Sequence, residues 1–337
     1  MLDKNKNRIT IYNVAQEAGV SITTVSRFLN NPENVKISTG ERVAAAMEKL
    51  DYIPQGNAGS RAHHRVGRVG VLTPFFPAPS FVARLRGMIK PLKEANYEVV
   101  IYTIETAAQL DEYLKSIPFT RRIDGLIIIS INLTHVQRRI LQAADLDVVM
   151  IESDEEDFSR VIADDYNGGK IAAELFIKKN YHPVAFLGDM NKELSYSCKP
   201  SDIRLRGFQK ALIENGITID ENLILESDTT VDDAKKAFLN FLDSNKPPRA
   251  IFAMSDIQAI GVLKAANTKG VKVPEEMAVL GFDNIETAEW MELSTISQHL
   301  TDSGRIAAKL LLERLSGNVK TIQKVNLQVG LIERSTT

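Results

Sequence analysis

The sequence predicts an α/β protein in which a small all-α helix-turn-helix domain precedes a large domain of two doubly wound, parallel-sheet lobes. Residues 10–29 contain two short amphipathic helical patterns that are separated by a turn with Gly19, which is the helix-turn-helix arrangement. From residue 68 onward, β-branched apolar runs alternate with amphipathic helical runs, and this is typical of parallel strands with helical crossovers. About ten such units exceed the usual size of one sheet, so we expect two similar lobes.

The N-terminal domain is expected to contain three helices. Thr10 is placed to cap a helix that runs to Ala18, and Gly19 then supplies the left-handed residue at which helices commonly end. Ser21 is placed to cap the second helix, and a third helix is expected over about 40–50. Their inward-facing apolar residues predict a small core: Val14, Ala15, Ala18, Val25, Phe28, Leu29, Val43, Met47 and Leu50.

The outer face of the second helix predicts contact with double-stranded DNA. Ile22, Thr23 and Arg27 fall opposite its buried face, towards the end of the helix that enters the major groove in helix-turn-helix proteins. Arg27 can donate two hydrogen bonds to guanine, and Ile22 can meet a thymine methyl. Residues 1–65 carry nine Lys/Arg against six Asp/Glu, whereas the remainder has an acidic excess, which favours an anionic partner for this part. The alternative is a helical cap that shows this spacing without binding DNA. The predicted contacts in the domain are Thr10, Tyr12, Ser21, Ile22, Thr23, Thr24, Ser26, Arg27 and Asn30.

In the large domain, expected strands and helices alternate along the sequence. Strand-like runs are expected at 68–74, 97–103, 125–131, 147–152, 183–188, 222–226, 249–255 and 277–282, with a further run starting at 160. Amphipathic helices are expected between them, at 81–96, 170–180, 203–216, 232–245 and 257–270. In such sheets ligands bind beyond the carboxyl ends of the strands. The polar residues at these ends are Glu152, Asp164, Asp165, Ser255, Asp256, Asp283, Asn284 and Gln298, with Arg204 at the start of a helix. Carboxylates that accept hydrogen bonds from vicinal hydroxyls suit a sugar; the alternative is that these residues are loop starts and helix caps.

The segment TIYNVAQEAGVSITTVSRFLN, followed by NPENVKISTGERVAAAMEKLDYIP, resembles the DNA-binding domain of the LacI/GalR family of bacterial repressors. The motifs ADDYNGG, DIRLRGF, IFAMSDIQAIG and VLGFDNIE continue the resemblance through the large domain. It implies a periplasmic-binding-protein-like fold with an effector in the cleft between two lobes. The implied effector contacts are Ser80, Phe81, Glu152, Arg204, Asp256, Asp283 and Gln298.

The resemblance also implies the organisation of the chain. We expect a helix-turn-helix domain at 1–54, a hinge segment at 55–65, and an effector-binding and dimerisation domain at 66–337. The N-lobe is expected at about 66–165 and 298–325, and the C-lobe at about 166–297 and 326–337. Because the chain ends without a heptad tail, a homodimer that reads a pseudo-palindromic operator is expected rather than a tetramer.

The expected function is a transcriptional regulator, a repressor of sugar-utilisation genes whose operator affinity is changed by a carbohydrate effector. A nucleobase or nucleoside effector is the alternative, and a free sugar-binding protein is a weaker one. An enzyme is not expected, because the phosphate loop, the GxSxG nucleophile elbow and the HExxH zinc helix are all missing from the sequence.

We expect a cytoplasmic protein without membrane contact. No apolar run approaches the roughly 18–20 residues of a membrane span, and the polar start MLDKNKNRIT lacks a signal-peptide core. The single cysteine, Cys198, excludes an internal disulfide and offers no metal-ligand spacing. No motif indicates a metal or a cofactor.

Three segments depart from the family pattern. Gly40 stands in the third helix and is expected to weaken it by up to ~1 kcal/mol relative to alanine. In the hinge QGNAGSRAHHR, Arg61 stands where the family has a leucine that wedges into the minor groove, with Ala62 beside it; we expect this hinge to order on DNA and Arg61 to enter an A·T-rich minor groove. SYSCKPSDIR, which runs into the arginine motif DIRLRGF, is also atypical.

Overall fold

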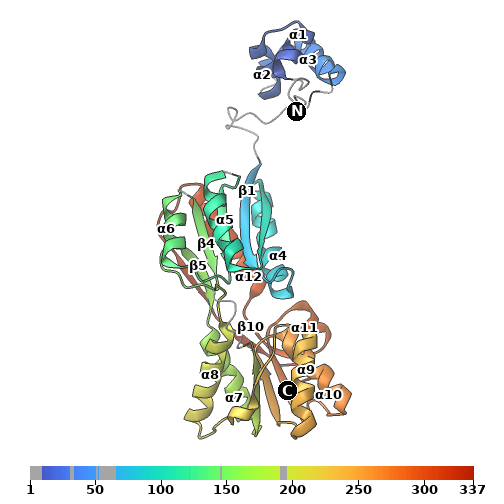
Figure 1. The fold of residues 1–337 in the computed structure, drawn as a ribbon, viewed down its shortest axis with the longest axis vertical. Coiled ribbons are helices and arrows are strands. Elements are labelled where there is room, and N and C mark those ends of the chain that lie inside the picture. Colours follow the sequence, from blue (N-terminus) through green and yellow to red (C-terminus); the bar gives the residue numbers. More distant parts are fainter. Residues whose placement is uncertain are drawn as a thin grey trace, which may run out of the picture. The chain divides into compact units, whose positions relative to one another are not determined.

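The computed structural model of the chain describes residues 10–30, 34–50, 52, 66–120, 122–144, 146–189 and 196–337. It separates into two compact units, residues 1–65 and residues 66–337, a small helical unit and a large α/β unit (Figure 1). The hinge segment 55–65, with Arg61 and Ala62, lies outside the described residues. No helix within the described ranges is long and apolar enough to cross a membrane.

The small unit consists of three helices, which are α1 Ile11–Ala18, α2 Ile22–Asn30 and α3 Ile37–Lys49. One valine from each helix, Val14, Val25 and Val43, is completely buried in their common core. The predicted left-handed end of α1 is confirmed, because Gly19 has a φ of 62°. The third helix begins three residues before the predicted position, since the carbonyl of Lys36 already accepts the N–H of residue 40 at 2.9 Å.

Gly40 has a packing role that helix propensity alone does not reveal. A Cβ at this position would lie 3.1 Å from Cε2 of Phe28, which is closer than ordinary van der Waals contact. The absence of a side chain therefore lets the Phe28 ring of α2 lie against α3. The expected weakening of the helix is offset, at least in part, by this contact.

The N-lobe of the large unit is built on six strands, β1 Gly67–Pro74, β2 Tyr97–Ile104, β3 Gly125–Ile129, β4 Asp147–Ile151, β5 Ser159–Ala163 and β11 Lys324–Leu327. They form a parallel sheet in the order β11-β5-β4-β3-β1-β2. Two helices, α4 Pro79–Glu94 and α12 Leu300–Leu315, pack on one face, and α5 Ala107–Thr120 and α6 His135–Ala143 pack on the other. The side chains of a strand alternate between the faces, so Val71 joins the first core and Leu72 the second.

The C-lobe repeats this architecture. Its strands are β6 Val184–Gly188, β7 Ile224–Glu226, β8 Ala250–Ala253, β9 Ala278–Asp283, β10 Ser294–Ser297 and β12 Gly330–Ile332, in the sheet order β12-β10-β9-β8-β6-β7. Its helices are α7 Asp165–Lys178 and α8 Pro200–Glu214 on one face, α9 Val231–Ser244 and α10 Asp256–Lys269 on the other, and two short elements, α11 Glu286–Trp290 and the 3-10 turn η2 Glu221–Leu223. The predicted parallel, doubly wound architecture is confirmed, and the sheet departs from it at one edge, where β12 pairs antiparallel to β10.

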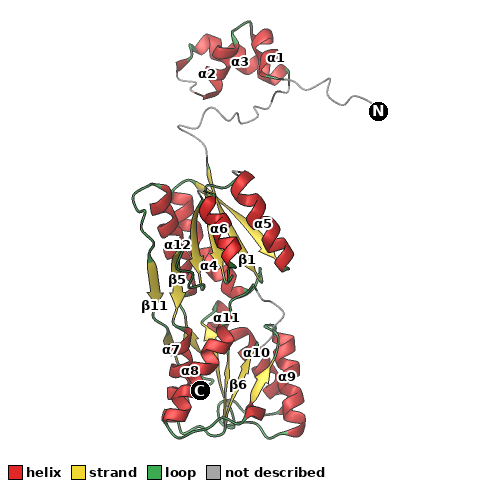
Figure 2. Cartoon of the chain, turned by 60° about the vertical axis from the view of Figure 1, so that its left-hand side comes forward, coloured by secondary structure: helices red, strands yellow, loops and turns green. Residues whose placement is uncertain are grey.

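The chain passes between the lobes three times, after β5, after β10 and after β11 (Figure 2). The third passage falls slightly later than the predicted boundary after 325. The reason is that β11 keeps its pairing with β5 as far as Leu327, opposite Ala163. The crossings bring the carboxyl ends of β4 and β9, one from each lobe, towards the same cleft, as the contacts described below show.

Candidate functional site

The outward face of α2 is fixed by the burial of Val25. Val25 is completely buried, so Ile22, Thr23 and Arg27 on other sides of the helix are exposed. Ser21 caps the helix, because its hydroxyl accepts the N–H of Thr24 at 3.1 Å. This arrangement leaves two short polar side chains, an apolar one and an arginine at the surface of a rigidly packed helix.

The remaining predicted DNA contacts differ in their placement. Tyr12, on α1, is 66% exposed, whereas Ser26 is half-buried and takes part in interactions of its own. Thr10 is the N-cap of α1, as predicted, and forms a capping box with Asn13. Its backbone N–H and its hydroxyl both donate to Oδ1 of Asn13, at 2.9 and 2.7 Å. The side chain of Asn30 lies outside the described part of the structure, like Arg61 and Ala62.

A buried arginine that the sequence did not single out, Arg84 on α4, joins the two lobes. It is 2% exposed. Its Nη2 donates to Oε1 of Glu152, which follows β4 in the N-lobe, and to Oε1 of Gln298 at 3.1 Å, at the second crossing. The amide of Gln298 donates in turn to Oδ1 of Asp283, at the end of β9 in the C-lobe. Predicted effector contacts from both lobes thus belong to one hydrogen-bond network.

The backbone at the ends of the strands adopts conformations that direct these side chains towards each other. Ser130, Glu152 and Asp283 adopt left-handed backbone conformations, with φ of 55°, 68° and 117°, which is uncommon for residues other than glycine and tends to occur at functional sites. Ser130 lies just after β3, and its hydroxyl donates to the second carboxylate oxygen of Glu152. Burial raises the pKa of Asp283 to about 6, although the positive charges of Arg204 and Arg84 oppose that rise.

Arg204 forms the C-lobe side of the site. From α8, its Nε donates to Oδ1 of Asp165 at 2.8 Å and its Nη1 donates to the carbonyl of Met254. Its guanidinium carbon lies 3.5 Å from the centre of the Phe282 ring, within the range of a cation–π contact. The side chain is 3% exposed, so Arg204 is held rigidly by three contacts.

Asp256 belongs to the interior of the C-lobe. It has no exposed surface. Thr295 donates to one of its oxygens at 2.5 Å, and the N–H of Ile285 donates to the other at 2.9 Å. Burial and the nearby charge of Asp283 raise its pKa well above the ordinary value. The two oxygens therefore brace β10 and the segment after β9, and a direct contact of Asp256 with the effector stays a prediction.

Other polar residues at the strand ends also act as caps and braces. The side chain of Asp164 accepts the N–H of Asn167, and the hydroxyl of Ser255 accepts the N–H of Gln258. Asn284 accepts from Arg334 at 2.9 Å. For these three, the structure agrees with the alternative that they are loop starts and helix caps.

The predicted contacts on α4 are placed at the N-lobe wall. Phe81 is 7% exposed and packs in the N-lobe core, with its ring centre 5.7 Å from the guanidinium of Arg84. The carbonyl of Ser80 accepts a long bond from Arg84 at 3.4 Å. Since Arg84 follows Ser80 by four residues, it lies one helical turn further along the same face, and this spacing is the sequence signal that could have identified it.

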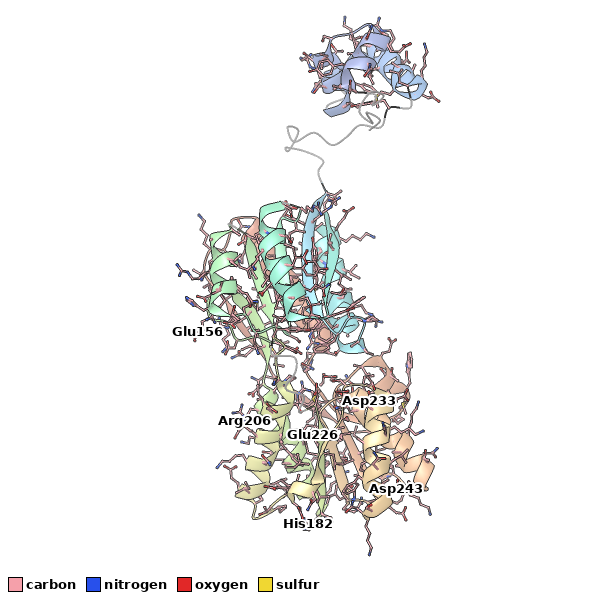
Figure 3. The ribbon with its side chains drawn as sticks, in the orientation of Figure 1. Glu156, His182, Arg206, Glu226, Asp233 and Asp243 are labelled. Carbon is pink, nitrogen blue, oxygen red and sulfur yellow. The ribbon has the colours of Figure 1, made fainter. Side chains whose placement is uncertain are left out.

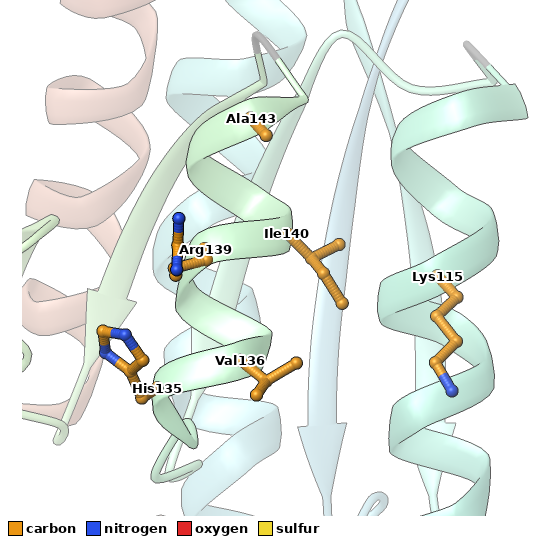
Figure 4. A pocket seen from close by; sticks show the side chains of 6 residues that line it. All are labelled: Lys115, His135, Val136, Arg139, Ile140 and Ala143. Atoms are coloured by element: carbon orange, nitrogen blue, oxygen red, sulfur yellow. The ribbon is translucent and has the colours of Figure 1, made fainter.

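A second hollow, of about 420 Å³, lies on the surface of the N-lobe between α5 and α6. Figure 4 shows its lining residues, Lys115, His135, Val136, Arg139, Ile140 and Ala143. All of them come from one lobe. Because a ligand shifts an equilibrium only by binding two arrangements differently, a ligand held within a single lobe has no direct means of changing the lobe arrangement.

Metal-binding clusters are not found in the part of the chain that the structure describes, where no three His, Cys, Asp or Glu side chains gather suitably. Of the histidines, His182 is exposed at the end of the C-lobe that points away from the N-lobe (Figure 3). It therefore lies far from the carboxylates of the cleft.

A helix-turn-helix unit and a two-lobed unit whose polar residues meet between the lobes, joined in one polypeptide, are the organisation of a transcriptional regulator. Residues 10–55 match the family described as bacterial regulatory proteins, lacI family, and residues 173–337 match the periplasmic binding protein-like domain. The chain belongs to the LacI family. It is 30% identical to the HTH-type transcriptional repressor PurR of Photobacterium profundum over 91% of this chain and 92% of that protein. It is 28% identical to catabolite control protein A of Priestia megaterium, over 95% and 96% of the two chains.

Solved structures of regulators share the fold. The lac repressor bound to ONPG in the repressed state superposes with a TM-score of 0.77 at 26% identity, covering 98% of this chain and all of that one. The complex of the transcriptional regulator CelR with cellobiose gives a TM-score of 0.71, also at 26% identity and with the same coverage. These relatives are named as regulators and repressors rather than enzymes.

Proposed function

We propose that the protein is a homodimeric repressor that binds a pseudo-palindromic operator through α2, and that a small carbohydrate in the cleft changes its operator affinity. The observation that carries the effector site is the buried cross-lobe set of two arginines and three carboxylates, Arg84, Arg204, Glu152, Asp165 and Asp283. Its members come from both lobes, so a ligand that replaces some of these bonds has a different affinity for each lobe arrangement. Such a difference is what an allosteric effector requires.

The chemistry of the cleft favours a polyhydroxyl ligand. Carboxylates accept hydrogen bonds from hydroxyls, and an arginine donates to the oxygens of the same group. Arg204 donates to one oxygen of Asp165 and Gln298 donates to one oxygen of Asp283, and a ligand hydroxyl is expected to donate to these same carboxylates. A related regulator was solved with cellobiose.

A nucleobase is the second candidate, because a relative at 30% identity is named PurR. A flat base needs an aromatic face to stack on. Arg204 already covers the ring of Phe282 at 3.5 Å, and Phe81 is 7% exposed within the N-lobe core. Neither of these two rings offers a free face, but Phe75 and Phe76, after β1, and Tyr166, in the first turn of α7, are exposed. Stacking therefore does not separate the two ligand classes, and the titration below does.

The ligand class is tested by calorimetric titration with a panel that contains ribose, cellobiose and other mono- and disaccharides, together with hypoxanthine and guanine. We expect a sugar of the panel to bind and Arg204→Ala to abolish that binding. Lys210→Ala, an exposed position on the same helix, serves as the control and leaves the affinity unchanged. Binding of a base but of no sugar would identify the effector as a nucleobase. Unchanged sugar binding by Arg204→Ala would show that the ligand does not bind between the lobes.

The DNA-binding role of α2 is tested separately with an operator obtained by selection from random DNA. Arg27→Ala is expected to weaken operator binding by about 1–3 kcal/mol and to relax the preference at one base pair. Lys49→Ala, an exposed position on α3 that pairs with Glu17, is the control. An equal loss on operator and on random DNA would assign Arg27 to a phosphate instead of a base.

A further inference from the structure

One short segment of the C-lobe is buried in the N-lobe. Residues 196–198 precede α8, which belongs to the C-lobe. The ring of Tyr196 is nevertheless 7% exposed and lies in the apolar cluster that α5 and α6 form with the N-lobe sheet. Burial, and the carboxylate of Glu105 at the end of the N-lobe strand β2, raise the pKa of its phenol. The segment lies in the stretch SYSCKPSDIR, which departs from the family pattern.

Backbone hydrogen bonds fasten this segment to the end of β3. The N–H of Asn132 donates to the carbonyl of Tyr196 at 2.8 Å, and the N–H of Cys198 donates to the carbonyl of Ser130 at 3.1 Å. Ile131 and Ser197 thereby form an antiparallel bridge. The side chain of Asn132 adds a bond to the carbonyl of Ser197 at 3.3 Å and lies 3.2 Å from the Cys198 sulfur. This is a direct attachment between the lobes, in addition to the three chain crossings.

The attachment ends at the effector site. Ser130, whose carbonyl holds the N–H of Cys198, donates its hydroxyl to Glu152. Glu152 continues through Arg84 and Gln298 to Asp283 of the C-lobe. A continuous series of contacts therefore leaves the C-lobe at Tyr196, passes through the N-lobe carboxylate and returns to the C-lobe on the other side of the cleft.

An exposed polar contact between the lobes is weaker. Arg86 of α4 pairs with Glu286 of α11 at 3.2 Å, but their side chains are 63% and 54% exposed. Exposed ion pairs contribute little because water screens them. The buried segment with its several hydrogen bonds is the stronger connection.

We propose that Tyr196 is a positioning residue of the effector site: residues 196–198 clasp the two lobes together and hold Ser130, and through it Glu152, in the orientation that receives the effector. The proposal rests on the cleft being the effector site. Its consequence is that loss of the Tyr196 ring releases the lobes from each other in the absence of any ligand. A test without effector therefore separates failure of the clasp from failure of the proposed function.

The first experiment measures the distance between the lobes in the full chain. Spin labels on Arg139→Cys in α6 and Lys210→Cys in α8, both exposed positions, are read by double electron–electron resonance. The background is Cys198→Ser, whose hydroxyl keeps a donor near Asn132, and unlabelled protein is added in excess so that only distances within one chain are seen. We expect a narrow distribution with Tyr196 and with Tyr196→Phe, and a longer and broader one with Tyr196→Ala.

The matched control is Phe158→Ala. Phe158 is also 7% exposed and lies in the same cluster, but it belongs to the N-lobe. Its loss should lower thermal stability comparably and leave the distance distribution narrow. Equal broadening by both substitutions, or none by Tyr196→Ala, overturns the proposal.

A second experiment keeps the native Cys198. Because Cys198 is the one cysteine of the sequence, Asn132→Cys creates a single possible intramolecular disulfide across the clasp. We expect mild oxidation to crosslink the chain nearly completely in the wild-type context and much less with Tyr196→Ala. Little crosslinking of Asn132→Cys itself, or equal crosslinking in both, contradicts the clasp.

Discussion

Replacement of Arg84 by methionine tests the energetics of the cleft. Methionine keeps much of the length and apolar stem of the side chain but removes the guanidinium that Glu152 and Gln298 share. Breaking a buried ion pair by removing one partner costs about 3–5 kcal/mol, because the other charge stays buried and unpaired. Glu152 retains the hydroxyl of Ser130 and is 13% exposed, so we expect the lower end, about 3 kcal/mol.

The assay is urea unfolding of the full chain at pH 7, followed by the loss of far-UV circular dichroism of the large unit. The double variant Arg84→Met with Glu152→Gln is the decisive comparison, because the glutamine removes the unpaired charge and should recover much of the loss. A loss below about 1 kcal/mol for Arg84→Met, the range of an exposed pair, would refute the view that Arg84 holds the cleft together.

Three further predictions follow from single residues. Because burial raises the pKa of Asp283 to about 6, its stabilising contribution is complete below the unfolded pKa of about 3.9 and is lost as the pH rises through 6. Asp283→Asn should therefore gain stability over the wild type between pH 4.5 and 7, by about 2 kcal/mol, in unfolding measured across that range; a constant difference contradicts this. Gly40→Ala should stabilise the small unit by less than the ~1 kcal/mol of helix propensity, since its Cβ meets Phe28 at 3.1 Å; the full gain in thermal unfolding would show that the ring moves freely. For the hinge, outside the described residues, Arg61→Leu should increase operator bending and reduce the salt dependence of binding; unchanged electrophoretic bending and salt slope would disprove a minor-groove role for the arginine.

Local signals in the sequence predicted the elements well where one residue or one period decides the structure. The left-handed Gly19 follows from a single glycine after a periodic run, and the alternation of strands and helices follows from their different periods. The antiparallel β12 was not predicted because its three residues contain no period, and its direction depends on how the chain returns after the third crossing.

The residues of the cleft were predicted only where a local signal in the sequence marks them. The carboxyl ends of strands are recognisable, so Glu152, Asp283 and Gln298 were named in advance. Asp256 was also named, but its enclosure in the C-lobe interior by Thr295 and Ile285 depends on tertiary packing. The position of Arg84, which reaches from α4 to Glu152 and Gln298, depends on tertiary packing too. Tyr196 shows the same limit, because its burial partner is a different lobe.

The central claim, that the cleft and α2 belong to one effector-controlled DNA switch, is tested most directly by a single affinity. Fluorescence anisotropy gives the dissociation constant of the full chain for its selected operator, with and without a saturating concentration of the ligand that the calorimetric panel identifies. The account predicts a change of at least about fivefold, the usual lower range of allosteric coupling, in the wild type and none in Arg204→Ala. An operator affinity that the bound ligand leaves unchanged in the wild type would contradict it.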